Sequence, residues 1–337
     1  MKPALRFLAR RFAWAVTLVL GVTSLSFVVV EVLPGDPARM LLGPQASAAD
    51  VTRARAIYGL DRSVSVQFVK YWAHLVHRGP PPTPKDRDHR SCAALVGGMH
   101  VDLGYSFHYR KPVVDLLIAK IPRSIELALA ALLLQLALGV SLGVSAAAKR
   151  GTAWDDAAMS ASLLGASAPT FLIGLMLQYI FAYKLGLLPF DGYGVTTADH
   201  LRSLVLPACT LGLFGSALYA RLTREEVASA LAQDFARAAR ARGASRARVL
   251  VVHGLRNALG PLTTMAALDL GTMVSGAVVT ERIFRWPGVG QLAIDAVLNR
   301  DGPVIFGTVL FSAAAVVVAT FTLDVVDLLV DPRLRAR

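Results

Sequence analysis

The sequence has few charged residues and almost no cysteine. Asp, Glu, Lys and Arg make up 17% of its 337 residues, whereas soluble domains average about 25%. Mean hydropathy is positive, at +0.53, so the chain lacks the charge that a wholly water-facing surface needs. Two cysteines, Cys92 and Cys209, exclude a disulfide framework and form no closely spaced metal or redox pair. No glycine is followed by lysine, which excludes the phosphate-binding loop of an ATPase.

Acidic residues are in the minority. The chain has 35 Lys and Arg against 23 Asp and Glu, a formal net charge of +12. On a soluble protein this excess would suggest a nucleic-acid partner. The high hydropathy argues against that interpretation, because the basic residues of a membrane protein gather on its cytoplasmic side.

Long uncharged runs predict the architecture. About 20 apolar residues of helix cross the roughly 30 Å of hydrocarbon in a bilayer, and a spanning backbone must satisfy its own hydrogen bonds. We therefore predict an all-α membrane protein with six transmembrane helices. The runs are 12–30, 127–148, 157–183, 203–220, 257–280 and 302–323, and only 257–280 contains a charge, that of Asp269. A cleavable signal peptide is the alternative for 12–30, but no small-residue cleavage site follows it, which favours a retained span.

Basic residues in the short loops predict the orientation. With the N-terminus in the cytoplasm, the inner segments 1–11, 149–156, 221–256 and 324–337 hold 17 Lys and Arg, and the short outer loops hold 5. Positive residues favour the inner side. We expect both termini in the cytoplasm of a multi-pass protein of the inner membrane.

Two segments outside the runs are too long to be simple connectors. The predicted organisation is therefore a tail and first helix at 1–32, an external segment at 33–122, a helical core at 123–328 and a cytoplasmic tail at 329–337. The external segment contains a Pro-rich tract at 79–88, which has too few apolar residues to fold alone. The core contains a cytoplasmic loop at 221–256.

Residues 221–256 have the local signals of two helices joined by a turn. Alanine and arginine favour helix in the first half, Gly243 is suited to end that helix, and Ser245 can cap the next one. Val227, Leu231 and Phe235 recur every fourth residue, which predicts an apolar face in water. The pattern indicates a helical elbow that docks against a soluble partner.

The elbow resembles the coupling loop of permease subunits in the dipeptide, oligopeptide and nickel ABC importers. The resemblance is carried by Asp-Phe-Ala-Arg-Ala-Ala-Arg-Ala-Arg-Gly at 234–243 and His-Gly-Leu-Arg-Asn-Ala-Leu-Gly-Pro at 253–261. It extends along nearly the whole chain. Further landmarks are Leu-Pro-Gly-Asp-Pro at 33–37, Tyr-Gly-Leu-Asp-Arg at 58–62, Asp-Leu-Gly-Tyr-Ser-Phe at 102–107, the Thr280-to-Gly290 stretch and Asp-Pro-Arg-Leu-Arg at 331–335.

The resemblance implies a type I ABC importer permease fold and a set of partners. These are a second, similar permease, two ATP-binding cassette ATPase subunits, an external solute-binding protein and the lipid bilayer; no nucleic acid is implied. The permease itself would hold no cofactor, since ATP is bound by the partner subunits. Small alanines at 236, 238, 239 and 241 would let the helix lie in a groove of an ATPase. The residues implied in ATPase coupling are Phe235 as the anchor, Ala238, Ala239 and, at the turn, Gly243.

Three departures from the family pattern stand out. Arg237 occupies the position of a glutamate in the wider signature, and residues 77–101 are longer than the usual spacing, so the Pro-rich tract looks like an insertion. Asp269 stands where the family more often has an uncharged polar residue. An ionisable group within a span is a candidate for function, so Asp269 could line the translocation path and favour cationic substrates. The alternative is a carboxyl that is protonated or hydrogen-bonded between helices.

Catalytic and metal sites are not expected. The loop residues His74, His77, His89, Cys92 and His100 have no tight ligand spacing, which favours a solvated loop over a metal centre. No His in any span could serve a membrane-embedded enzyme as its base. The predicted function is a non-enzymatic ABC permease for peptides or a related small solute. The alternative is an ion-coupled secondary transporter, for which the sequence shows no convincing internal repeat.

Overall fold

The computed structural model describes residues 2–32, 37–43, 45–58, 60–78, 91–94 and 98–330. Most of the landmarks at 33–37 and 331–335, the Pro-rich tract at 79–88 and His89 lie outside these residues. Contacts divide the chain into two compact units, each of which is described by itself. This division does not test the functional segments 1–32, 33–122, 123–328 and 329–337, which stay a prediction.

The first unit comprises Met1–Arg123, Gly288–Val317 and Arg335–Arg337. Its core lies where the first turns of α5 meet α13 and the start of α14, with Val113, Leu117 and Val289 fully or nearly fully buried. Its elements are α1 (Lys2–Val32), α2 (Pro37–Leu42), α3 (Ala48–Tyr58), α4 (Val64–Leu75), β1 (Val76–Arg78), β2 (Cys92–Ala94), β3 (Met99–Asp102), the start of α5 (Val113–Ala148), α13 (Val289–Leu298) and the start of α14 (Gly302–Val330).

Aromatic contacts attach helix α4 to two long apolar helices. The ring of Phe27 in α1 stacks on Phe306 in α14 with centroids 5.7 Å apart, and Phe68 of α4 meets Phe27 edge-on at 5.2 Å. Tyr71 of α4 lies 5.1 Å from Phe306. Such ring pairs add stabilisation beyond the area they bury, so α4 is fixed although it carries few fully buried residues.

A small antiparallel sheet, in the order β1-β3-β2, was not predicted. It lies in the region 77–101 that the sequence identifies as longer than the family spacing. His77 pairs in register with His100, and Cys92 with Asp102. Strands of three or four residues give too short an alternation to be recognised from the sequence.

Buried hydrogen bonds explain why 102–107 is a landmark. Asp102 Oδ1 accepts a bond of 2.8 Å from the backbone N–H of Gly104, whose φ of +82° requires glycine. Asp301, which is fully buried, accepts bonds from Ser106 Oγ at 2.5 Å and from the backbone N–H groups of Phe107 and His108 at 3.2 and 3.0 Å. One carboxylate therefore fixes the turn at 106–108 to the loop before α14.

We expect Asp301→Ala to lower the stability of the protein by about 3–5 kcal/mol, because it leaves buried donors without their charged acceptor. Thermal unfolding in detergent checks this, and the midpoint should fall by roughly 10 °C. Asp61→Ala, which removes an exposed carboxylate of the same unit, is the control and should shift the midpoint little. Equal shifts for the two variants would contradict a structural role for Asp301.

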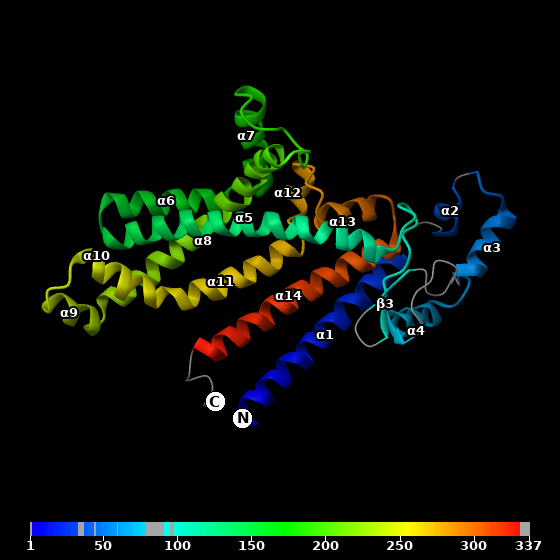
Figure 1. Cartoon of the computed structure of the whole chain (residues 1–337), viewed down its shortest axis with the longest axis horizontal. Helices are drawn as coiled ribbons and strands as arrows, with labels where there is room; N and C mark the ends of the chain where they lie inside the picture. Colours follow the sequence, from blue (N-terminus) through cyan, green and yellow to red (C-terminus); the bar gives the residue numbers. More distant parts are fainter. Residues whose placement is uncertain are drawn as a thin grey trace. The chain divides into compact units, whose positions relative to one another are not determined.

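The second unit comprises Ser124–Pro287 and Val318–Leu334. Within it α6, α8 and α11 run side by side, with α9 and α10 at one end (Figure 1). Its elements are the rest of α5, α6 (Ala153–Ser167), α7 (Thr170–Leu177), the π-helix η1 (Gln178–Lys184), α8 (Thr197–Ala232), α9 (Asp234–Ala241), α10 (Arg246–Arg248), the π-helix η2 (Val249–Leu255), α11 (Arg256–Val274), α12 (Val278–Ile283) and the end of α14.

Glycines let α5 and α8 pack backbone against backbone. A Cβ on Gly139 would lie 2.5 Å from Tyr219 Cβ, and one on Gly143 would lie 2.5 Å from the carbonyl oxygen of Ala220. On the other side, a Cβ on Gly215 would collide with the side chain of Gln135. Small residues at helix contacts let apolar helices associate closely in lipid. The glycines therefore determine how closely α5 and α8 pack.

Within the described residues, length and apolar composition identify four helices that could cross a membrane: Ala9–Val28, Val113–Ala148, Thr197–Ala232 and Gly302–Leu323. A fifth is reached if the bent pair Ala153–Ser167 and Thr170–Lys184 counts as one span. The sixth run, 257–280, corresponds to α11, which ends at Val274 before Gly276 with φ +119° and is not among these spans. Membrane-spanning helices are confirmed, while the number six stays a prediction.

The run 157–183 is not one straight helix. It breaks between α6 and α7 with a bend of 97°. Pro169 stands at the break, and Ala168 before it has extended dihedrals of −76° and 129°. A proline disfavours helical dihedrals in the preceding residue, so the break follows from Pro169 although hydropathy is continuous across it.

Candidate functional site

The predicted elbow at 221–256 forms, and its first helix is the end of α8. Helix α8 continues from the uncharged run 203–220 to Ala232 without interruption. Gln233 then adopts extended dihedrals of −79° and 160°, and α9 starts at Asp234. The elbow therefore begins as a direct extension of a membrane-spanning helix.

The predicted apolar face of Val227, Leu231 and Phe235 does not exist as one exposed stripe. Val227 is fully buried and Leu231 is half-buried, in a core with Tyr219 and Ala258. Phe235 lies on a different helix, because the chain turns at Gln233, and 38% of it is exposed. The prediction of a water-facing stripe is wrong for the first two residues, because periodicity does not say whether water or another helix covers an apolar face.

Helix α9 has an inner and an outer side. Ala236 and Ala239 are buried against Val249 of η2. Ala238 is exposed, and Phe235 is exposed with its ring 6.2 Å from that of His253. Phe235 and Ala238 are thus accessible to a partner, whereas Ala239 contributes to the packing inside the elbow.

Gly243 ends α9 in a Schellman motif, as the sequence predicts. Its φ is +84°, its N–H donates to the carbonyl of Arg240 at 3.0 Å, and the N–H of Ala244 donates to the carbonyl of Ala239 at 3.1 Å. Ala244 also packs in the cluster of Ala239, which is the apolar contact typical of this motif. Ser245 Oγ then accepts from the N–H of Arg248 at 3.3 Å, which confirms it as the cap.

Two arginines of the elbow differ in their contacts, which the sequence does not reveal. Arg240 Nη2 donates to the carbonyl of Leu231 at 2.8 Å, in the last turn of α8, and so bridges α8 and α9. Arg237, at the position of the signature glutamate, makes an exposed contact of 3.4 Å with Asp234 in its own helix. Exposed pairs of this kind stabilise little, so Arg237 is free of structural constraint compared with Arg240.

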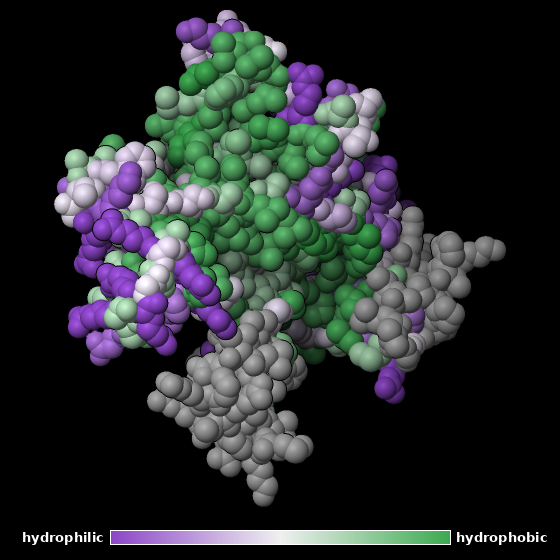
Figure 2. Space-filling view, turned by 60° about the vertical axis from the view of Figure 1, so that its left-hand side comes forward, coloured by the Kyte–Doolittle hydropathy of each residue, from purple (hydrophilic) through white to green (hydrophobic). Residues whose placement is uncertain are grey.

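The elbow end of the molecule is strongly hydrophilic. Arg237, Arg240, Arg242, Arg246 and Arg248 are all exposed there. Figure 2, in which the end with α9 and α10 comes forward, shows hydrophilic side chains gathered beside a broad apolar surface. An apolar surface of that extent is unusual on a soluble monomer and fits contact with lipid.

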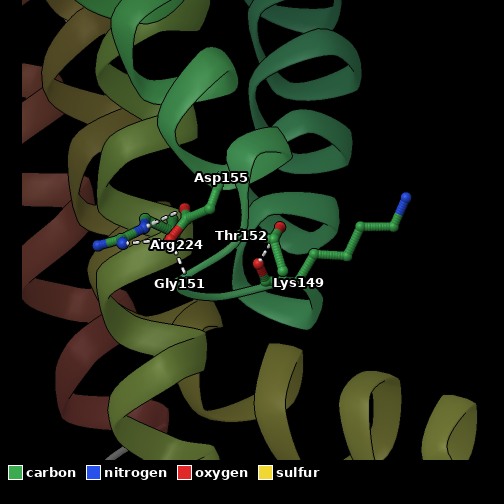
Figure 3. A network of polar contacts seen from close by, with 5 residues as sticks. All are labelled: Lys149, Gly151, Thr152, Asp155 and Arg224. Carbon is green, nitrogen blue, oxygen red and sulfur yellow. Dashed lines mark hydrogen bonds and ion pairs between the residues drawn. The ribbon is translucent and has the colours of Figure 1, made fainter.

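A buried ion pair holds α8 at the start of the elbow (Figure 3). Arg224 donates to both carboxylate oxygens of Asp155, with Nε to Oδ1 at 2.7 Å and Nη2 to Oδ2 at 2.6 Å. The N–H of Gly151 donates to the same carboxylate at 3.1 Å. Hydrogen bonds from Arg224 lower the pKa of the Asp155 carboxyl to about 2. The ion pair therefore stabilises the folded state fully at pH values above the ordinary carboxyl pKa of about 4. This stabilisation is lost only as the pH falls towards 2.

Asp269 lies on α11 next to the hydroxyl of Tyr219 on α8. Tyr219 is fully buried, and its hydroxyl has no hydrogen-bond partner within standard geometry among the described residues. Asp269 itself is half-buried. Both predicted roles, a group of the translocation path and a carboxyl held between helices, are compatible with this position.

A second polar cluster joins α5, α8 and the loop between α12 and α13. The ring of His200 contacts the carboxylate of Glu126 and, through Nδ1, the carbonyl of Tyr193 at 2.8 Å. Trp286, fully buried, lies 4.9 Å from the Tyr193 ring. Both nitrogens of His200 therefore lie beside oxygen atoms, those of Glu126 and Tyr193.

The landmark at 280–290 has a structural basis in the same unit. Glu281 is fully buried and accepts a hydrogen bond of 2.9 Å from Ser124 Oγ. Among the described residues there is also no candidate metal site. No group of three or more His, Cys, Asp or Glu in this part of the chain has the geometry to hold a metal ion. His77 and Cys92 form one polar contact of 3.6 Å.

Solved structures define the class of the fold. A chain of the MetNI methionine ABC transporter, in inward-facing conformations, matches with a TM-score of 0.53 at 17% identity, covering 67% of this chain and 97% of that chain. The all-α permease fold of an ABC importer is therefore confirmed, with a small sheet added in the first unit.

The sequence comparisons identify the family. Residues 139–336 match the binding-protein-dependent transport system inner membrane component, and residues 4–128 match the N-terminal component of the same kind of system. The chain belongs to this family of inner-membrane transport components. It is thus a multi-pass permease and not an enzyme, and its partners are an ATPase and a solute-binding protein. Membership excludes the ion-coupled secondary transporter.

Close relatives match over almost their full length. The di/tripeptide transport system permease protein DppB of Pseudomonas aeruginosa is 35% identical over 98% of this chain and 99% of its own. The dipeptide permease DppB of Escherichia coli K12 and the glutathione permease GsiC of Salmonella paratyphi A are each 32% identical, over 98% of this chain and 99% of theirs.

Proposed function

We propose that this protein is one of two permease subunits that together form the translocation path of a peptide importer. The observation that carries the proposal is the elbow, in which a Schellman turn at Gly243 holds a short helix at the end of a long apolar one. Relatives named as dipeptide and di/tripeptide transport permeases support peptides as the substrate class.

The elbow supports docking by α9 against an ATPase subunit. Phe235 and Ala238 present an apolar contact with little steric bulk, surrounded by exposed arginines. Buried apolar side chains at the centre of an interface, enclosed by polar ones, supply most of its binding energy. Ala239 acts indirectly, by letting α9 pack closely on η2.

Closure of the ATPase subunits on ATP would displace α9. Because α9 is fixed to α8 by the bond from Arg240 to Leu231 and by the cluster around Ala236, the displacement reaches the helices of the second unit. The access of the path then changes from one side of the membrane to the other. Gating by such rigid movement is a known type of transition.

The distribution of arginine and lysine supports an orientation with both termini in the cytoplasm. The elbow alone holds eight of the 35 basic residues, and the positive-inside rule assigns such short loops to the cytoplasm. The segment 33–122 would then face the binding protein. Cysteine labelling at positions of the elbow and of α3 tests this assignment.

Asp269 is proposed as a group of the translocation path that favours cationic peptides. Asp269→Asn removes the charge at nearly constant volume, and we expect uptake of a lysine-containing dipeptide to fall by about tenfold relative to a neutral dipeptide. Uptake of the two peptides in proteoliposomes measures the ratio. Tyr219→Phe is the matched control, because it removes the neighbouring hydroxyl and keeps the carboxylate. Equal changes for both peptides in Asp269→Asn would leave only a packing role.

The complete transporter tests the proposed function. The two permeases, the ATPase subunits and the binding protein are reconstituted together, and uptake of a labelled neutral dipeptide is followed with and without ATP. We expect uptake that requires ATP and the binding protein. ATP-independent uptake, or none while the ATPase remains active, would refute the proposal.

A further inference from the structure

The ion pair of Asp155 and Arg224 lies outside the docking surface of the elbow. Arg224 lies one turn beyond the uncharged run 203–220, on the part of α8 that leads to α9. Asp155 lies in the first turn of α6, 69 residues away in sequence. The pair therefore connects the α5–α6 loop to the base of the elbow.

The two side chains of the pair are buried and have a fixed relative orientation. Only 1% of the Asp155 side chain and 24% of the Arg224 side chain are exposed. The two parallel N–H···O bonds fix the plane of the guanidinium against that of the carboxylate, which a single point contact could not do. The third bond, from Gly151, holds the carboxylate in the loop turn, where Gly151 has a φ of +77°.

Helix α5 also packs against α8 at Arg224. A Cβ on Gly143 would lie 2.6 Å from Thr223 Cβ and 3.1 Å from the backbone nitrogen of Arg224. The backbones of α5 and α8 are therefore in contact at Arg224. Gly143 and Asp155 therefore both contact α8 at the point where the elbow begins, and Gly151 holds the Asp155 carboxylate in place.

We propose that Asp155 and Arg224 are positioning residues for coupling, which transmit the displacement of the elbow through α8 to the α5–α6 pair. The inference rests on the proposed function. A pair of this kind suits transmission because a packed, hydrogen-bonded contact shifts as a unit and does not deform continuously. Neither residue touches the exposed face of α9, so the pair acts after docking.

The test separates docking from transmission. The complete transporter is reconstituted with Asp155→Asn, Arg224→Gln or the exchanged pair Asp155→Arg/Arg224→Asp, and three quantities are measured: ATPase subunits retained on the purified permease, ATP hydrolysis, and uptake of a labelled neutral dipeptide. We expect the single variants to retain the ATPase and its hydrolysis and to lose uptake by about tenfold or more. The exchanged pair should regain uptake by about threefold or more over the single variants, because it restores opposite charges at the two positions.

A second ion pair on the same helix provides the matched control. Arg221 and Glu225 are 3.1 Å apart, with 70% and 54% of their side chains exposed. Arg221→Gln removes the same charge from α8 one turn earlier, and uptake should stay within about twofold of the wild type. The comparison therefore isolates the buried pair from the net charge of the elbow.

Three outcomes would overturn the inference. They are uptake close to wild type in either single variant, loss of the ATPase in parallel with uptake, and an exchanged pair no better than the single variants. The wild-type transporter tests the proposed function on its own: without ATP-dependent uptake that function fails, whereas normal uptake in both wild type and single variants refutes only the role of the pair.

Discussion

Gly243→Pro is expected to abolish ATP-dependent uptake. Proline fixes φ near −65° and has no N–H, whereas Gly243 has a φ of +84° and donates a bond of 3.0 Å to the carbonyl of Arg240. The variant therefore loses both hydrogen bonds of the Schellman motif, and α9 no longer keeps its angle to η2. Uptake by the reconstituted transporter and ATPase retention measure the effect, and both should fall by more than about tenfold.

Gly243→Ala tests the effect of the left-handed backbone conformation without a steric clash. A Cβ at this position would meet nothing within 4 Å, so the only cost is that of a left-handed conformation, about 1 kcal/mol. We expect uptake reduced by about twofold to fivefold. Gly260→Ala, in α11 with open space around it, is the control and should leave uptake unchanged. Normal uptake in Gly243→Pro would show that the turn has no part in coupling.

Phe235→Glu is expected to prevent the ATPase from binding to the permease. The side chain is 38% exposed and belongs to no buried cluster of the described residues, so a carboxylate there is tolerated by the fold. At an interface, the loss of an aromatic anchor costs about 2 kcal/mol or more of binding free energy. This corresponds to a dissociation constant that is roughly 30-fold higher. Co-purification of the ATPase with the tagged permease measures the change.

Two further variants control for charge and for size. Phe235→Leu keeps an apolar side chain and should retain most of the bound ATPase. Ser229→Glu adds the same charge at an exposed position that belongs to α8 and not to α9, and should have little effect on binding. If Phe235→Glu retained the ATPase as well as Ser229→Glu does, α9 would not be the docking element.

Local signals in the elbow were sufficient to predict part of the site. Gly243 as a helix stop and Ser245 as a cap are confirmed, because both depend on hydrogen bonds between residues a few positions apart. The exposure of Phe235 and Ala238 agrees with their predicted contact surface, while their contact with an ATPase stays a prediction. The burial of Ala239 depends on η2, which lies outside any local pattern.

The bend at Pro169 and the buried positions of Val227 and Leu231 show where patterns of hydropathy fail. Apolar residues bury equally well against protein and against lipid, so an uncharged run cannot distinguish a straight span from a broken one. In the same way, a repeat of four predicts a helical face without saying whether water or another helix covers it. Here Gly254 of η2 lies against the side chain of Val227, in a core that also includes residues of α5 and α11.

By itself the sequence determined the class of protein and the position of the elbow, because the transfer of apolar residues into lipid and the pairing of local backbone groups need only neighbours along the chain. The tertiary structure decided what the elbow is attached to. Asp155 and Arg224, Ser106 and Asp301, and Gly143 against α8 are all pairs of residues far apart in sequence. Each forms only because helix packing brings opposite charges or bare backbones within a few ångströms, and that proximity is a property of the folded chain.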